Sequence, residues 1–209
     1  MTMDIRTMLF ALALGNLAIC VALFFHMYDR HKTPALGTWA LARQLQAGGW
    51  LLLFMRGTGI LPDLVTVPAG YSLVFAGLAA EVVALRQAVE MRSWRLPMIA
   101  AIALSVPAYL AAFVIDADGI RVVAGSLIMG ALYFASAAAL ASGWGGASAA
   151  RRFLAVATAL LAAVVTARGV MVLTMPQGWG WLSDPFLQVV SSGAFYLLMV
   201  LGCVGFMLI

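Results

Sequence analysis

The first long apolar stretch of the chain runs from Thr7 to Met27 and reads TMLFALALGNLAICVALFFHM. A helix of about 20 residues is long enough to cross a bilayer. One acid and one arginine precede the stretch, whereas Arg30 and Lys32 follow it closely. A secretory signal peptide has its positive charge before a shorter apolar stretch, and a small-residue cleavage site after it. This segment has the reverse polarity and no such site, so we expect a retained first helix with its N-terminus outside.

The composition of the whole chain extends this conclusion. Of its 209 residues, 65% are apolar and 10% are charged, and the mean hydropathy is +1.05. A soluble domain is about half apolar and about a quarter charged. Six more apolar stretches follow the first, at about 38–55, 67–89, 96–115, 120–141, 153–174 and 185–209. We therefore predict an all-α integral membrane protein, a seven-transmembrane helix bundle that forms a single domain over residues 1–209.

Seven spans also limit what else the chain can contain. They leave about 60 residues for loops and ends. That is too few for a folded aqueous domain of ordinary size. A nucleic-acid-binding module and a soluble enzyme domain are therefore excluded.

The basic residues give the orientation of the predicted bundle. With the N-terminus outside, the inner side holds Arg30, Lys32, Arg43, Arg86, Arg92, Arg95, Arg151 and Arg152. The outer side holds Arg6, Arg56, Arg121 and Arg168. Because Lys and Arg are more frequent in cytoplasmic loops, this distribution predicts an outside N-terminus and a cytoplasmic C-terminus. The sequence stops at Ile209 within an apolar run, so we expect a piece of a longer protein, cut before a cytoplasmic output domain.

Glu81 is the deepest acid of the predicted bundle. A charge at membrane depth costs about 2.5–3.5 kcal/mol on insertion scales. Gly70 and Gly77 lie on or near the same face of its helix, and small residues let another backbone approach. Glu81 is therefore expected to face the bundle. It is either a protonatable switch or ligand contact, or a packed residue that reaches toward Arg43 or Arg86.

Three arginines lie near the outer ends of three predicted helices. Arg56 ends the second stretch, Arg121 opens the fifth, and Arg168 lies near the outer end of the sixth. Guanidinium groups match carboxylates and phosphates, so together they would border an outer cavity for an anionic ligand or lipid head group. The alternative is mutual neutralisation, because the outer side also carries five aspartates, among them Asp63.

Trp50 lies in the middle of a predicted helix, after two glycines, unlike the other tryptophans at helix ends. It either floors a cavity or packs in the core. The candidate ligand-binding residues are Arg56, Arg168, Trp50, Asp63, Arg121 and Glu81.

The sequence lacks the residues that several cofactor and metal sites require. The only lysine is Lys32, in a predicted inner loop, so a retinal Schiff base is not expected. His26 and His31 lie at one helix end, which disfavours haem ligation from facing helices. No cluster of His, Cys and Asp has metal-ligand spacing. We expect no cofactor, no metal and no catalytic residue, and we do not expect this chain to be an enzyme by itself.

Three stretches of the chain resemble one family when taken together. They are MDIRTMLFALALGN (3–16), WALARQLQAGGWLLLFMRGTGILPD (39–63) and FYLLMVLGCVGFMLI (195–209). They resemble the N-terminal membrane sensor regions that precede GGDEF-type diguanylate cyclase domains, and some histidine kinases, in bacterial signalling proteins. The residues that match the pattern are Trp39, Arg43, Trp50, Arg56, Gly57, Pro62 and Asp63, and Arg168 stands where a sixth-helix arginine is expected.

The resemblance implies a function. The chain would be a sensory input domain in the bacterial inner membrane. It would bind a small molecule, a lipid or another membrane cue and transmit it through the seventh helix to an output domain of the same chain. That output domain, a diguanylate cyclase or a histidine kinase, is absent here. The implied partners are membrane lipids, an unidentified ligand and, in a homodimer, a second copy; no nucleic acid is expected.

Two other classes of protein remain open. A shift of 112 residues places Arg56-Gly57 on Arg168-Gly169 and superposes the first three helices on the last three. This internal similarity matches the layout of a small transporter with three, one and three helices, in which Glu81 would couple transport to protons. The other alternative is a membrane subunit of a larger complex.

Overall fold

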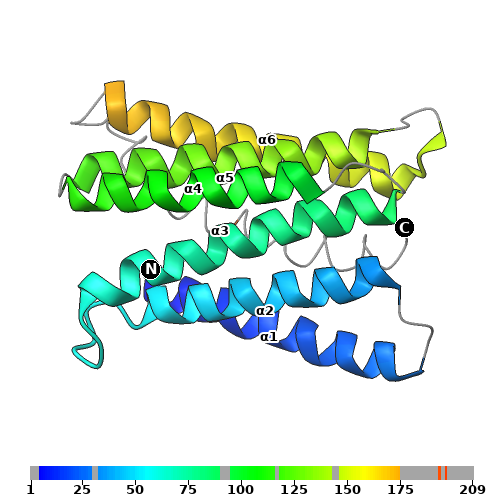
Figure 1. Ribbon diagram of the computed structural model, residues 1–209, viewed down its shortest axis with the longest axis horizontal. Coiled ribbons are helices and arrows are strands. Elements are labelled where there is room, and N and C mark those ends of the chain that lie inside the picture. The colour runs from blue at the N-terminus through cyan, green and yellow to red at the C-terminus, as the bar shows by residue number, and fades with distance from the viewer. Residues whose placement is uncertain are drawn as a thin grey trace.

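The computed structural model describes residues 5–29, 33–89, 95–115, 118–142, 146–174, Gly193 and Tyr196. The protein is all-α over these residues. Its helices are α1 (Ile5–Asp29), α2 (Pro34–Phe54), α3 (Asp63–Ala88), α4 (Arg95–Val114), α5 (Asp118–Ala141) and α6 (Ala149–Thr174). Figure 1 shows them lying side by side along the long axis of the molecule.

The described residues contain six helices rather than the seven predicted. The seventh predicted range, 185–209, lies outside the described residues apart from Gly193 and Tyr196, both of which are helical. The six helices begin one to four residues earlier than the apolar stretches indicate. The reason is the capping of the helix starts by polar residues and proline. The Thr33 side chain accepts a hydrogen bond from the Leu36 N–H, Pro34 opens α2, and the Ser148 hydroxyl accepts from the Arg151 N–H before α6.

Four helices of the described part are long and apolar enough to cross a membrane, as in a multi-pass membrane protein. The candidate spans are Arg6–Leu23, Asp63–Ala88, Gly119–Ala141 and Ala149–Thr174. In α4 the apolar stretch is shorter, Ile99–Val114. Neither α4 nor α2 is therefore among the four candidate spans, although both were predicted to be spans. For α2 the cause is its polar side chains. It carries Arg43 and Gln46 among its buried residues, and α1 and α3 pack beside it.

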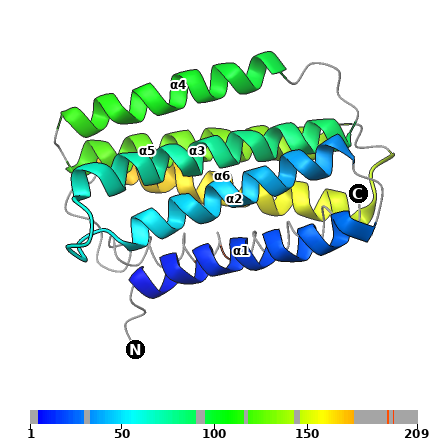
Figure 2. The same ribbon diagram turned by 60° about the horizontal axis from the view of Figure 1, so that its bottom comes forward.

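The two closest helix pairs are α2–α3 and α5–α6. Helix α1 packs along α2 (Figure 2). Helix α3 contacts both α4 and α5 and so connects the two pairs. The α2–α3 loop (55–62), the start of α5 and the end of α6 lie at the same end of the bundle. We call this end the Arg56 end. The sequence analysis predicts that it faces outside.

Glycines bring α2 and α3 into backbone contact and let α5 and α6 pack closely. A Cβ atom on Gly49 would lie 2.7 Å from the Gly70 carbonyl oxygen, and one on Gly77 would lie 2.9 Å from the Ala42 carbonyl oxygen. Such distances leave no room for a side chain, so α2 and α3 cross as closely as helices can. As expected, Gly70 and Gly77 are thus the places where another backbone approaches the face of Glu81. In the second pair, a Cβ on Gly169 would meet Ser126 Cβ at 3.0 Å.

Candidate functional site

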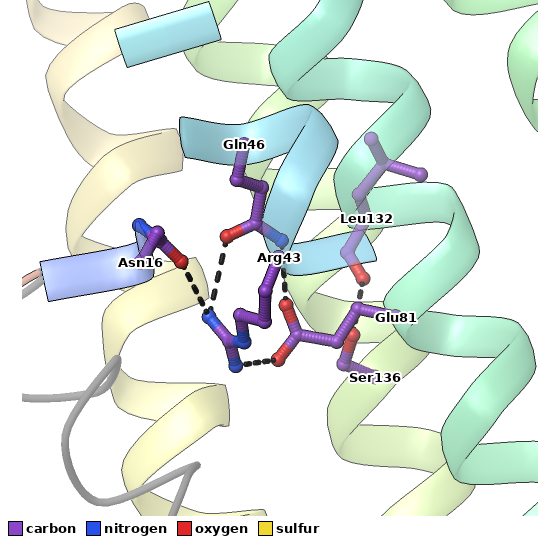
Figure 3. A network of polar contacts seen from close by, with 6 residues as sticks. All are labelled: Asn16, Arg43, Gln46, Glu81, Leu132 and Ser136. Carbon is purple, nitrogen blue, oxygen red and sulfur yellow. Dashed lines mark hydrogen bonds and ion pairs between the residues drawn. The ribbon is translucent and has the colours of Figure 1, made fainter. Parts of the chain in front are cut away.

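A buried polar network joins the first three helices. Asn16 of α1, Arg43 and Gln46 of α2, and Glu81 of α3 point toward one another (Figure 3). The first three side chains are almost fully buried, and the Glu81 side chain is 16% exposed. Glu81 stands seven residues before the end of α3, a rise of about 10 Å, so the network lies well inside the helical bundle.

Arg43 is the centre of this network. Its Nη2 donates to Glu81 Oε1 at 2.8 Å, and its Nη1 donates to Gln46 Oε1 at 3.2 Å and to Asn16 Oδ1 at 3.5 Å. The guanidinium also lies 5.2 Å from the centroid of the Trp39 ring, within the range of a cation–π contact. Its Nε–H is buried and has no hydrogen-bond partner among the described residues. The cation is therefore held by one carboxylate, two amide oxygens and one aromatic face.

Each oxygen of Glu81 accepts one hydrogen bond. Oε1 accepts from Arg43, and Oε2 accepts from Gln46 Nε2 at 2.8 Å. Figure 3 also labels Ser136 of α5, whose hydroxyl donates to the Leu132 carbonyl oxygen of its own helix at 3.2 Å. The hydrogen bonds of the network therefore join α1, α2 and α3.

The sequence analysis left several partners open for Glu81. The structure pairs it with Arg43, one of the two arginines named there. Asn16 and Gln46 were missed. One signal was available for each of them: Asn16 interrupts the longest apolar stretch of the first helix, and Gln46 lies three residues after Arg43 on the same helix face.

A second group of polar side chains lies at the Arg56 end. Arg56 Nε is 3.9 Å from Asp63 Oδ2, and both side chains are more than half exposed. Asp63 makes its short contact elsewhere, because its Oδ1 accepts from the Gly57 N–H at 2.8 Å. Arg6 Nη2 donates to the Gly57 carbonyl at 3.3 Å. Gly57 has φ +68°, which a residue with a side chain adopts at a cost, so the loop turns on this glycine. Arg56 and Asp63 thus form a weak exposed pair, while Asp63 holds the loop.

A buried and a partly buried tyrosine pack together between α3 and α4. The ring centroids of Tyr71 on α3 and Tyr109 on α4 are 4.5 Å apart, and Phe75 packs edge-on to Tyr109. The three predicted outer arginines belong to elements that meet at the Arg56 end of the bundle. Arg56 lies in the α2–α3 loop, Arg121 in the first turn of α5 and Arg168 in the second half of α6.

The other contacts of these candidate residues are as follows. The Arg121 guanidinium lies 4.6 Å from the centroid of the Phe113 ring on α4. Trp50 is 7% exposed and belongs to the main apolar core, together with Phe75 and Tyr109. Of the two alternatives for Trp50, packing in the core is therefore the one that its surroundings support. Glu81 belongs to the other polar group, nearer the opposite end of the bundle.

Neither polar group has the composition of a metal centre. Within the described residues, no three or more His, Cys, Asp and Glu side chains come together as metal ligands would. No family model, no curated protein and no solved structure matches the chain. Any function must therefore be argued from the two polar groups and from the sequence pattern.

Proposed function

We propose that the chain is the membrane-embedded sensory input domain of a bacterial signalling protein, a diguanylate cyclase in the first instance. In this proposal it spans the inner membrane with seven helices, from an outside N-terminus to a cytoplasmic C-terminus. A small molecule, lipid or membrane cue binds near the outer end. The seventh helix transmits the signal to an output domain.

The observation that carries this proposal is that Arg56, Arg121 and Arg168 belong to three separate elements, the α2–α3 loop, α5 and α6, whose ends meet at the Arg56 end of the bundle. Cations from separate helices that meet at one end of an apolar bundle provide a place where an anion can act on several helices at once. A signal receptor needs such a shared contact, because a ligand shifts a conformational equilibrium only by its differential affinity for two states.

The residues of the sequence pattern support the same proposal. Trp39 is buried and stacks on Arg43, and Arg43 binds Glu81. Trp50 lies in the core, and Arg56 pairs with Asp63 at the loop. The pattern therefore marks contacts that fix α2 within the bundle and shape the proposed ligand end.

The alternative, a small transporter driven by protons through Glu81, receives less support. Each Glu81 oxygen already accepts a hydrogen bond from a buried donor, and Arg43 lies 2.8 Å away. A proton-carrying carboxyl would have to break these contacts in every cycle. The third helix of the second half in that layout falls in 185–209, outside the described residues.

The test uses the gene that encodes this chain. We expect the reading frame to continue past codon 209 into a charged linker and a GGDEF or kinase domain. Product formation by that longer protein is then measured against candidate cues in the parent, Arg56→Ala and Arg168→Ala, with Arg152→Ala at the opposite end of α6 as the matched control. The first two variants should lose the response and keep basal output. A stop codon after Ile209, or a normal response in both variants at normal expression, would refute the proposal.

A further inference from the structure

The α2–α3 loop (55–62) and the first turn of α3 expose a group of large apolar side chains. Ile60 is 68% exposed, Leu61 38%, Leu64 73% and Val65 51%. A single apolar side chain on a surface needs no explanation, whereas several that follow one another mark a surface that contacts a membrane or a partner. We call these four residues the loop patch.

The loop that carries the patch has a defined shape. Gly57 and Gly59 have φ values of +68° and +77°, in the left-handed region that favours glycine. The Thr58 hydroxyl donates to the Met55 carbonyl oxygen at 2.7 Å, and the Thr58 N–H donates to the same oxygen at 3.2 Å. The loop therefore turns tightly and keeps its shape by its own hydrogen bonds, and the exposure of the loop patch follows from that shape.

Two candidate membrane spans start beside one residue of this loop. The first span starts at Arg6, whose Nη2 donates to the Gly57 carbonyl oxygen at 3.3 Å. The second starts at Asp63, whose Oδ1 accepts from the Gly57 N–H at 2.8 Å. Gly57 therefore lies at the level where both helices enter the membrane. Because the head-group layer is only about 5–8 Å thick on each side of a bilayer, side chains at this level reach the acyl chains.

The charged residue of the loop suits the same position. The Arg56 side chain is 59% exposed, and its contact with Asp63 is long, at 3.9 Å. An arginine at a membrane surface keeps its guanidinium among the head groups while apolar neighbours enter the acyl layer. Segments that lie in the membrane interface combine cationic and apolar side chains in this way. A lipid surface therefore accounts for both the loop patch and the exposed cation beside it.

We infer that the α2–α3 loop is an interfacial anchor, which inserts the loop patch into the acyl chains of the adjoining lipid leaflet while Arg56 stays at the head groups. The anchor holds the end of α2, which is not among the candidate spans, at the membrane surface. It does not depend on the proposed signalling function, because it requires the membrane and no output domain.

The test measures the depth of the loop in lipid vesicles. The fluorescent dye NBD is attached at Ile60→Cys in a Cys20→Ala/Cys203→Ala background, and the chain is reconstituted in vesicles of phosphatidylcholine and phosphatidylglycerol. The matched control is Leu160→Cys, an exposed position in the middle of the candidate span Ala149–Thr174. Quenching is recorded with aqueous iodide and with phosphatidylcholine that carries a nitroxide either near the head group or near the end of the acyl chain.

We expect the Ile60 dye to lie about 5–10 Å below the head groups, with stronger quenching by the shallow nitroxide than by the deep one and with little quenching by iodide. The Leu160 dye should show the reverse order of the two nitroxides. Leu61→Asp/Leu64→Asp places two charges in the loop patch and should raise the iodide quenching of the Ile60 dye severalfold. Leu61→Val/Leu64→Val, which keeps the patch apolar, should leave the quenching unchanged.

Three results would overturn the inference. The first is strong iodide quenching of the Ile60 dye without nitroxide quenching, which would place the loop patch in water. The second is an unchanged signal in Leu61→Asp/Leu64→Asp, which would mean that the dye and not the loop enters the lipid. The third is protection from iodide in native membranes but not in pure lipid vesicles, since the occupant would then be a protein partner. None of them bears on the signalling proposal, which is measured as output from the longer protein.

Discussion

Removal of one member of the Arg43–Glu81 pair should destabilise the protein far more than removal of both. At 2.8 Å and an effective dielectric constant of about 20, the gross attraction between the two charges is about 6 kcal/mol. Desolvation of the two ions offsets most of this gain. A single replacement leaves that desolvation cost without its compensation. We therefore expect Arg43→Met and Glu81→Met each to lower the free energy of unfolding by about 3 kcal/mol.

The double variant separates this explanation from a simple loss of packing. In Arg43→Met/Glu81→Met no buried charge remains, and two long apolar side chains fill similar volumes. Its cost should not exceed that of either single variant, which corresponds to a coupling of at least about 3 kcal/mol.

Glu81→Gln tests the hydrogen bonds of the same network. Glu81 now accepts from Arg43 on one oxygen and from Gln46 on the other. An amide offers one oxygen and one NH₂ group. Whichever way the new amide and that of Gln46 are turned, two donors face each other, because Arg43 also donates to Gln46. The isosteric change should therefore also be destabilising, by about 1–3 kcal/mol.

The assay is reversible unfolding in mixed micelles, followed by helical circular dichroism. Gln44→Met is the matched control, because Gln44 is an exposed neighbour on α2 and its replacement should change stability by less than about 0.5 kcal/mol. The reasoning is refuted if both single variants resemble this control. Additive costs in the double variant would equally exclude a coupled pair.

Three further predictions concern the helix contacts and the loop. Gly77→Ala should lower the free energy of unfolding by about 1–3 kcal/mol, because its Cβ would lie 2.7 Å from Gln46 Cγ. Gly37→Ala is the control, since a Cβ there would meet nothing within 4 Å and should be neutral or stabilising. Equal effects of the two changes in the unfolding assay would contradict this prediction. Asp63→Ala should speed proteolysis of the 55–62 loop by removing the acceptor of the Gly57 N–H, while Asp63→Asn should keep that bond and the parent rate. The α2 segment alone should insert poorly into the membrane in an insertion reporter. Arg43→Leu should make its apparent insertion free energy more favourable by about 3 kcal/mol. Efficient insertion of the parent segment would disprove the role given to the Arg43 charge.

The helices of the described part could be read from the apolar stretches, since a bilayer-length run of apolar residues has few other stable structures. Their first turns could not, because helix starts are set by polar caps and proline rather than by hydropathy. Thr33, Pro34 and Ser148 all look like loop residues in a hydropathy profile, although they start or precede helices.

The partner of Glu81 was undecidable between Arg43 and Arg86 because the choice depends on how far α3 slides along α2. That register is set by glycines. Gly70 and Gly77 lie seven residues apart on α3, and the backbone atoms they meet belong to Gly49 and Ala42, also seven apart on α2. Two matching seven-residue spacings were thus present in the sequence. They could have been used to align the helices before any side chain was paired.

For the outer arginines, in contrast, the sequence holds no comparable spacing that aligns their helices. Arg121 and Arg168 are 47 residues apart in sequence, and the 112-residue shift that places Arg56 on Arg168 does not say which helices pack together. Sequence reasoning reached the three residues through their chemistry and their predicted membrane side. It had no means to identify the contact between Tyr71 and Tyr109, because that contact follows from how α4 packs on α3, which depends on side-chain shape.

Helix α2, which is not among the candidate membrane spans, shows how the helices of the bundle select their neighbours. Lipid offers no hydrophobic drive for helices to associate, so partner choice must come from close packing and from polar groups that need each other. In α2, Arg43 and Gln46 make exposure to lipid costly, and Gly49 makes a close neighbour possible. On α3, Glu81 meets both polar side chains while Gly77 admits the α2 backbone. The residues that make α2 a poor membrane span are therefore the same ones that select α3 as its neighbour.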